Sequence, residues 1–356
     1  MLFQYIYPER HEFENLNQYL VHFINSLLNT TSKSKFDLDV YFHEDFIDIL
    51  KDSPMLNEKF RNFFDSFKKL NDDTKNLFIE SLNQAQNCQT VFSDVTIDIL
   101  NWKTDSIGAL LGDDSFKQLA DYLFTCVKYD RWQIKNHYQQ IYDALEHKVC
   151  PFCGVHPMHQ TFREDYDHLA PKSLYPLLSI NPRNLAPMCH DCNAKNKGAK
   201  DVLYDAGGNR KTFIYPYNNH ISVSLNFEGS VIPQTDLDIE DGVWEVRFIP
   251  ENDSTAYWNE IFNIKRRYLD DFLIPNYDQW LTDFVKDCID ESIDLNDIDN
   301  LKDQLSGFAR KFNRKWYEQA NIIKGPLFDF LANCNNDIFF NSITSMYNRL
   351  NRNEAA

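Results

Sequence analysis

Four of the eight cysteines of the chain form two closely spaced pairs. Cys150 and Cys153 make the first C-x2-C sequence, and Cys189 and Cys192 make the second after a gap of 35 residues. Two such pairs supply four thiolates, which is a ligand set of structural zinc sites. Disulfides would need an oxidising compartment, and a single redox motif does not account for a second pair. We therefore predict a structural Zn2+ whose binding is part of folding.

The segment between the cysteine pairs combines a carboxylate, a base and two amides. Asp167 and His168 are adjacent, Asn184 follows later, and Asn193 stands directly after the last cysteine. Metal-assisted hydrolysis of a phosphodiester needs a base for water, a cation and oxygen ligands for that cation. Adjacent residues of a strand point to opposite faces, so the Asp-His pair needs a bend, and Pro171 is consistent with one.

This segment resembles the HNH endonucleases. The resemblance rests on C-x2-C, D-H-x-x-P-K-S-x-Y-P and N-L-x-P-x-C-x-x-C-N-x-x-N-K, over roughly residues 148–200. It implies a ββα-metal core with zinc knuckles, His168 as general base, and Asn184 as the residue that positions the loop of the base. It also implies that Asp167 and Asn193 hold a catalytic Mg2+ or Mn2+. The last motif residue is often histidine, and Asn193 in its place leaves the metal preference open.

The charged residues divide unevenly along the chain. The net charge is -17, with -9 in residues 1–147, +3 in residues 148–211, -1 in residues 212–234 and -10 in residues 235–356. Acidic segments weaken non-specific binding to DNA, so they are expected to restrain a nuclease core. Three lysines of the positive segment are expected to contact phosphate in preference to staying in solvent: Lys195, Lys197 and Lys200.

Two other groups of residues are expected to have plainer roles. Three histidines near the cysteines, His156, His159 and His190, are expected beside the zinc site or on the surface, because four cysteines already complete it. Four basic residues occur together with aromatic residues late in the chain. We expect a solvated helix face paired with nearby acids there, rather than a nucleic-acid contact, for Arg310, Lys311, Arg314 and Lys315.

Hydrophobic periodicity predicts helices on both sides of the cysteine segment. Phe60, Phe63, Phe64, Phe67 and Leu70 recur at helical spacing. Asp72 or Asp73 is expected to cap the next helix, whose core residues are predicted as Leu77, Phe78 and Leu82. Alternation predicts two or three strands within residues 213–250, carried by Ile221, Val223, Leu225 and Phe227.

Periodicity predicts an α+β protein with mostly helical flanks, and the resemblance to HNH endonucleases implies a ββα-metal nuclease core between them. The expected segments are a helical N-terminal domain, a zinc-stabilised core, a strand-rich extension and a helical C-terminal domain, at residues 1–147, 148–212, 213–250 and 251–356. The sequence has no run of about 18 apolar residues and no signal-peptide pattern. We therefore expect a cytoplasmic protein without a membrane partner.

The predicted function is metal-dependent hydrolysis of DNA. The resemblance further suggests a bacterial anti-phage defence or restriction-type effector, controlled by its flanks or by a regulatory partner such as an ATPase. The alternative is a non-catalytic zinc-containing module that binds DNA or a protein. An RNA substrate also stays open, and the residues leave the cleavage sequence, the trigger and the oligomeric state undefined.

Overall fold

The described part of the chain forms two compact units. The computed structural model describes residues 4–9, 11–104, 114–126, 130–160, 166–217, 223–232, 243–318 and 320–354. The N-terminal unit comprises Gln4–Lys148 and Met158–Ile221, and the C-terminal unit comprises Val149–Pro157 and Ser222–Ala356, each within its described residues. The segment boundaries predicted from the sequence stay predictions.

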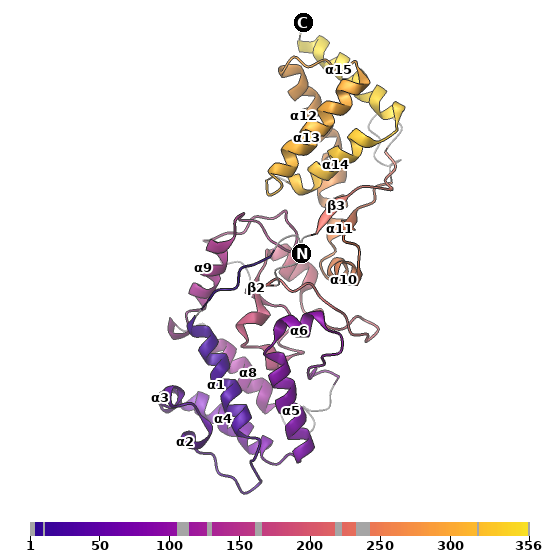
Figure 1. Ribbon diagram of the computed structural model, residues 1–356. Coiled ribbons are helices and arrows are strands. Elements are labelled where there is room, and N and C mark those ends of the chain that lie inside the picture. Colours follow the sequence, from indigo (N-terminus) through magenta and orange to yellow (C-terminus); the bar gives the residue numbers. More distant parts are fainter. Residues whose placement is uncertain are drawn as a thin grey trace. The chain divides into compact units, whose positions relative to one another are not determined.

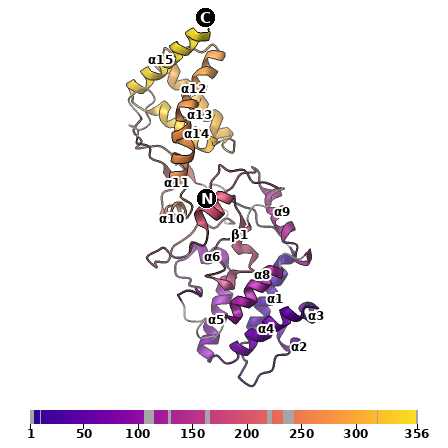
Figure 2. The same cartoon turned by 180° about the vertical axis from the view of Figure 1, so that it is seen from behind.

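The N-terminal unit contains helices, several of which lie side by side in Figures 1 and 2. Their bounds are α1 Glu12–Ser26, α2 Leu38–Tyr41, α3 Glu44–Asp52, α4 Pro54–Phe67, α5 Asp72–Ala85, α6 Cys88–Ser93, α8 Ser115–Cys126 and α9 Ile134–Ala144. The helix α4 packs mainly against α8. This arrangement confirms the prediction of a helical segment before the cysteines.

Aromatic side chains fill the core between these helices. The predicted apolar face of α4 is fully buried at Phe60, Phe63 and Phe67. The Phe63 ring lies 5.6 Å from that of Phe78 on α5 and 5.2 Å from that of Phe116 on α8, measured between centroids. Tilted aromatic pairs at this separation add to the stabilisation that burial provides.

The helix α5 differs from the sequence-based prediction in two details. The side chain of Asn71, and neither aspartate, caps the helix by accepting a hydrogen bond from the backbone N–H of Thr74 at 2.8 Å. Asp72 and Asp73 occupy the first turn, where their charge complements the helix dipole. Leu77 is not a core residue, because half of it is exposed.

A small sheet in the N-terminal unit carries the motif between the cysteine pairs. Strands β1 (Tyr166–His168) and β2 (Leu185–Pro187) are antiparallel, with Asp167 opposite Ala186. A π-helical turn, η4 (Asp191–Lys197), follows β2. Its hydrogen bonds span five residues, so it is wider than an α-helix, a feature that often occurs at functional sites.

The C-terminal unit joins a second small sheet to helices. Antiparallel strands β3 (Ser224–Asn226) and β4 (Arg247–Ile249) confirm strand formation in the predicted region. The predicted alternation is visible at Val223, Leu225 and Phe227, which are buried, whereas Ile221 lies outside the described residues. The helical elements are α10 Asp253–Phe262, α11 Ile264–Arg267, η6 Tyr268–Leu273, α12 Ile274–Asp290, α13 Ile298–Arg314, α14 Asn321–Asn333 and α15 Asp337–Glu354.

The protein is therefore mostly helical with small antiparallel sheets, which confirms the α+β class at this coarse level. The helices α13 and α14 form the most extensive contact between helices in the described residues. Among the helices that the structure describes, none has both the length and the apolar character required to cross a membrane.

Two glycines of the helices α13 and α14 provide a matched test of their packing. A Cβ atom on Gly325 in α14 would lie 2.0 Å from the side-chain oxygen of Asn313 in α13 and 3.3 Å from its backbone nitrogen. Gly325→Ala is expected to destabilise the protein by about 1 kcal/mol, because the steric cost exceeds the gain in helix propensity. Thermal and urea unfolding measure this change.

Gly307 in α13 is the control for that substitution. Its added Cβ atom would meet nothing closer than Arg310 at 3.8 Å. Gly307→Ala is therefore expected to stabilise the protein by about 0.5–1 kcal/mol through helix propensity alone. Equal stabilisation by both alanines would contradict the close approach of α13 and α14 at Gly325.

Candidate functional site

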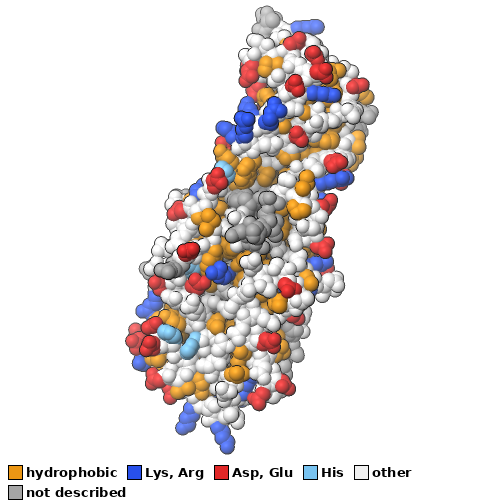
Figure 3. All heavy atoms as spheres, viewed as in Figure 1, with side chains coloured by type: hydrophobic (Ala, Val, Ile, Leu, Met, Phe, Trp, Pro, Cys, Tyr) orange, Lys and Arg blue, Asp and Glu red, His pale blue; other side chains and the backbone are white. Residues whose placement is uncertain are grey.

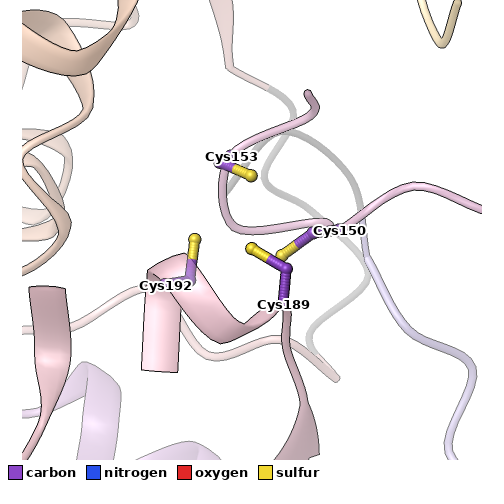
Figure 4. Close-up of side chains that lie close together, drawn as sticks. All are labelled: Cys150, Cys153, Cys189 and Cys192. Atoms are coloured by element: carbon purple, nitrogen blue, oxygen red, sulfur yellow. The ribbon is translucent and has the colours of Figure 1, made fainter. Parts of the chain in front are cut away.

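The structure brings the four predicted zinc ligands together. The sulfur atoms of Cys150, Cys153, Cys189 and Cys192 all lie within 4.8 Å of one another, and all four residues are buried (Figure 4). Four thiolates at zinc-bonding distance in a tetrahedron are about 3.8 Å apart, so a small adjustment suffices to bind the ion. Within the described ranges, no other group of three or more His, Cys, Asp or Glu side chains is arranged for a metal.

Local turns explain how each pair presents its sulfur atoms. The backbone N–H of Gly154 donates to the carbonyl oxygen of Cys150 at 2.7 Å, and Gly154 has a φ of +65°. Glycine adopts this left-handed conformation without steric cost, so it suits the turn that follows Cys153. In the second pair, the N–H of Asn193 donates to the carbonyl oxygen of Cys189 at 2.9 Å. The two pairs therefore have the donor set and the local turns of a structural zinc site.

His168 occupies a buried position at the end of β1. Its Nε2 lies 2.7 Å from the carbonyl oxygen of Ser179, and its ring centroid lies 4.5 Å from that of Phe124 on α8. A carbonyl oxygen only accepts hydrogen bonds, so Nε2 carries the proton and Nδ1 has the basic lone pair. The chain thus fixes one tautomer of the imidazole.

The surroundings of His168 favour its neutral form. Its pKa is lowered from 6.5 to about 4, mainly because burial disfavours the imidazolium, and the ammonium groups of Lys172 and Lys197 act in the same direction. The hydrogen bond to Ser179 opposes this shift. At neutral pH the ring is therefore uncharged and able to accept a proton.

Asn184 connects the two ends of the loop that follows His168. Its Nδ2 donates to the carbonyl oxygens of Ala170 and Leu178, at 3.0 and 3.2 Å, and its Oδ1 accepts from the N–H of Ala170 at 2.9 Å. The side chain is completely buried. Asn184 thereby holds in place the loop on which Ser179 contacts His168.

Asp167 forms an ion pair with a buried lysine. Its Oδ2 lies 2.6 Å from Nζ of Lys197, which belongs to η4 and has a side chain only 1% exposed. An ammonium group so deeply buried depends on a partner for its charge. Asn193, the other residue expected to hold a catalytic ion, is half-buried on the same helical turn.

The remaining predicted residues differ in exposure. Lys195 and Lys200 are exposed, and Lys195 pairs with Asp191 at 2.6 Å. Lys197 differs from both, because its buried ammonium contacts Asp167. Of the three nearby histidines, His156 is half-buried, and His159 and His190 are exposed.

Sequence reasoning did not find the side chains that α8 contributes beside His168. Phe124 contacts the imidazole, and Asp121 pairs with Lys172, whose ammonium lies 5.5 Å from the centre of the Phe124 ring. A usable signal exists in α8, where Phe124 is half-buried and adjoins the buried face of the helix. Its contact with His168 could nevertheless not be predicted, because the two residues are 44 positions apart and no local sequence pattern links them.

Comparison with known proteins gives one partial similarity. Protein ea31 of Escherichia phage lambda is 41% identical to this chain over 71 residues. These residues are 19% of this chain and 20% of the phage protein, so the chain spans only a small part of this relative. No family model and no solved structure matches the chain.

Proposed function

We propose that the chain is an HNH-type, metal-dependent endonuclease that hydrolyses phosphodiester bonds of DNA. The proposal depends above all on one observation, the hydrogen bond from Nε2 of His168 to the carbonyl oxygen of Ser179. This bond leaves Nδ1 to accept a proton, as a general base must. The strand pair β1 and β2, the following turn η4 and the cysteine cluster further support an HNH core.

In the proposed reaction, Nδ1 of His168 takes a proton from water. The oxygen of that water attacks phosphorus, the bond from phosphorus to the 3′ oxygen breaks, and the leaving oxygen gains a proton from solvent. The products carry 5′-phosphate and 3′-hydroxyl ends. Mg2+ or Mn2+, when bound, would supply positive charge for the phosphate and the leaving oxygen. Asn184 contributes by holding the loop behind His168.

Asp167 and Asn193 offer the oxygen atoms for this divalent ion. One carboxylate and one amide, completed by substrate phosphate and water, form a set of ligands typical of Mg2+. Lys197 is the competitor, since its ammonium is bound to Oδ2 of Asp167. To bind Oδ2 of Asp167, the ion would have to displace the ammonium of Lys197. Alternatively, both cations would lie beside the substrate phosphate, with the ammonium still bound to Asp167.

The metal dependence of plasmid cleavage tests the proposed function. Purified full-length protein is incubated with supercoiled plasmid and Mg2+, Mn2+ or excess EDTA, with zinc content measured in each sample. We expect nicked or linear plasmid with Mg2+ or Mn2+ and none with EDTA. An intact plasmid under every condition, from folded and zinc-loaded protein, would contradict an autonomous nuclease.

The pH dependence of cleavage tests the state of His168. A general base works only when deprotonated, so activity should fall on the acid side as the pH drops through the pKa of the imidazole. Because that pKa is lowered to about 4, we expect the rate to stay high through pH 6 and to decline near pH 4. A decline centred near 6.5 would indicate an exposed imidazole instead.

The second candidate function is a non-catalytic zinc module that binds DNA or protein. The ion pair between Asp167 and Lys197 favours it, because it occupies a carboxylate oxygen that a catalytic ion would need. DNA binding without cleavage, unchanged by Mg2+ and by His168→Ala, would establish this function in place of hydrolysis.

The biological role that we propose is anti-phage defence or restriction, under control of the acidic flanks or of a regulatory protein such as an ATPase. Net charges of -9 and -10 in the flanking segments would oppose non-specific DNA binding. Infection of bacteria that express the wild type or His168→Ala tests this role. Equal plaque numbers in both, across a panel of phages, would contradict it.

A further inference from the structure

The end of α13 carries a dense run of basic side chains. Arg310, Lys311, Arg314 and Lys315 fall within six residues that contain no acid, and all four are exposed. Residues four apart share a helix face, so the arginines form one column and the lysines an adjacent one. Figure 3 shows Lys and Arg side chains gathered on one flank of the helices of the C-terminal unit.

The two columns have different neighbours. Lys311 lies 3.6 Å from Asp287 of α12, and Lys315 lies 3.6 Å from Glu318. The lysines thus match the expectation of a helix face paired with acids. In the described part of the chain, no carboxylate lies within 4.0 Å of Arg310 or Arg314. The arginine column is therefore available to an anionic partner.

A groove of about 420 Å³ is lined by sequence neighbours of Arg314, although neither arginine lines it. Asn313 and Trp316, which flank Arg314 in the sequence, line it together with Ser224 and Asp329. It continues into a second hollow of about 360 Å³ that shares Asp329. The indole ring, an amide, a hydroxyl and a carboxylate share this concave space with the apolar residues Val223, Leu225, Ile322 and Pro326, a combination that suits a planar ligand with polar edges.

We propose that the C-terminal unit binds single-stranded nucleic acid at this place. The guanidinium groups of Arg310 and Arg314 contact successive phosphates, and an unstacked base enters the groove against Trp316. The carboxylate of Asp329 accepts a hydrogen bond from the exocyclic amino group of a base such as cytosine or adenine. A paired duplex keeps its bases stacked and cannot fill the groove. The choice of nucleic acid as partner rests on the proposed nuclease function.

Binding without cleavage tests this site. Full-length protein carrying His168→Ala is titrated into a fluorescent single-stranded oligonucleotide of mixed sequence, without added Mg2+ or Mn2+, at several salt concentrations. Arg310→Gln with Arg314→Gln should weaken binding roughly tenfold and reduce the salt slope by about 1.4, since each phosphate contact on a single strand contributes about 0.7. Trp316→Ala should weaken binding roughly tenfold as well.

A second arginine pair provides the matched control. Arg349 and Arg352 on α15 are exposed and, within the described residues, also lie without a carboxylate inside 4.0 Å. Arg349→Gln with Arg352→Gln removes the same charge as the substitution of Arg310 and Arg314. It should alter the affinity less than about twofold, because only the overall charge changes. Equal losses from both pairs, equal binding of a duplex, or no binding by the parent protein would each overturn the proposed site.

The outcome separates this inference from the proposed function. If the protein cleaves plasmid but its affinity for a single strand does not change when Arg310 and Arg314 are replaced, the proposed binding site is overturned and the proposed nuclease function stands. Binding that depends on these arginines, in a protein that never cleaves, would support the site and count against hydrolysis.

Discussion

Alanine in place of Cys192 is expected to abolish zinc binding and to destabilise the protein by about 5 kcal/mol or more. The sulfur of Cys192 belongs to a buried cluster in which all four sulfur atoms lie within 4.8 Å. Removal of one ligand leaves only three thiolates, which cannot complete a tetrahedral zinc site. Without the ion, the negative charges of these buried thiolates repel one another. Metal analysis of the purified protein gives the zinc content, and thermal unfolding with and without added chelator gives the stability.

Cys288→Ala is the control for the loss of a buried sulfur. Cys288 lies on α12 and is 1% exposed, so its burial resembles that of Cys192, which is fully buried. It should retain one zinc per chain and cost only about 1 kcal/mol, the effect of a small cavity. One zinc per chain in Cys192→Ala, together with unchanged chelator sensitivity, would contradict the zinc site.

Asp167→Asn is expected to destabilise the protein by about 3–5 kcal/mol, because it leaves the ammonium of Lys197 buried without its carboxylate. The two groups lie 2.6 Å apart, and Lys197 has a side chain that is 1% exposed. Chemical denaturation measures the change, and zinc analysis shows whether the cysteine cluster stays intact. The substituted amide has the shape of the carboxylate, so the change in charge dominates the effect.

A double-mutant cycle supplies the control for this ion pair. Lys197→Met retains the length and apolar part of the side chain, so it should cost less than Asp167→Asn. The combined variant should be more stable than Asp167→Asn alone, because no unpaired charge is left buried. Strictly additive costs would show that the two side chains do not interact in the folded protein.

The cysteine cluster could be predicted from the sequence because the spacing within each of its two pairs is a local pattern. Each cysteine pair spans four residues, and Gly154 allows the turn after the first pair. The buried face of α4 could also be predicted, because its phenylalanines recur with the period of a helix. The cap of α5 was predicted wrongly at Asp72 or Asp73, because Asn71, Asp72 and Asp73 are consecutive residues that can all cap a helix, and the structure places the cap at Asn71.

The surroundings of His168 could not be predicted, because they depend on contacts distant in the sequence. Phe124 reaches the imidazole from α8, and Ser179 reaches it from the loop that Asn184 holds. The burial of Lys197 could not be predicted either, because a lysine among other basic residues is expected to be exposed to solvent. Its burial follows from the pairing with Asp167, thirty residues earlier.

The role of His168 in DNA cleavage is the central claim, and its most direct test is a comparison of two histidine variants. Purified wild type, His168→Ala and His159→Ala are incubated with supercoiled plasmid and Mg2+ or Mn2+, after zinc content and unfolding temperature are shown to match. His159 is exposed, so its loss should leave cleavage unchanged. We expect His168→Ala to lower the cleavage rate by at least about 100-fold, the usual contribution of a general base. Cleavage by His168→Ala at the wild-type rate would contradict the assignment of His168 as the base.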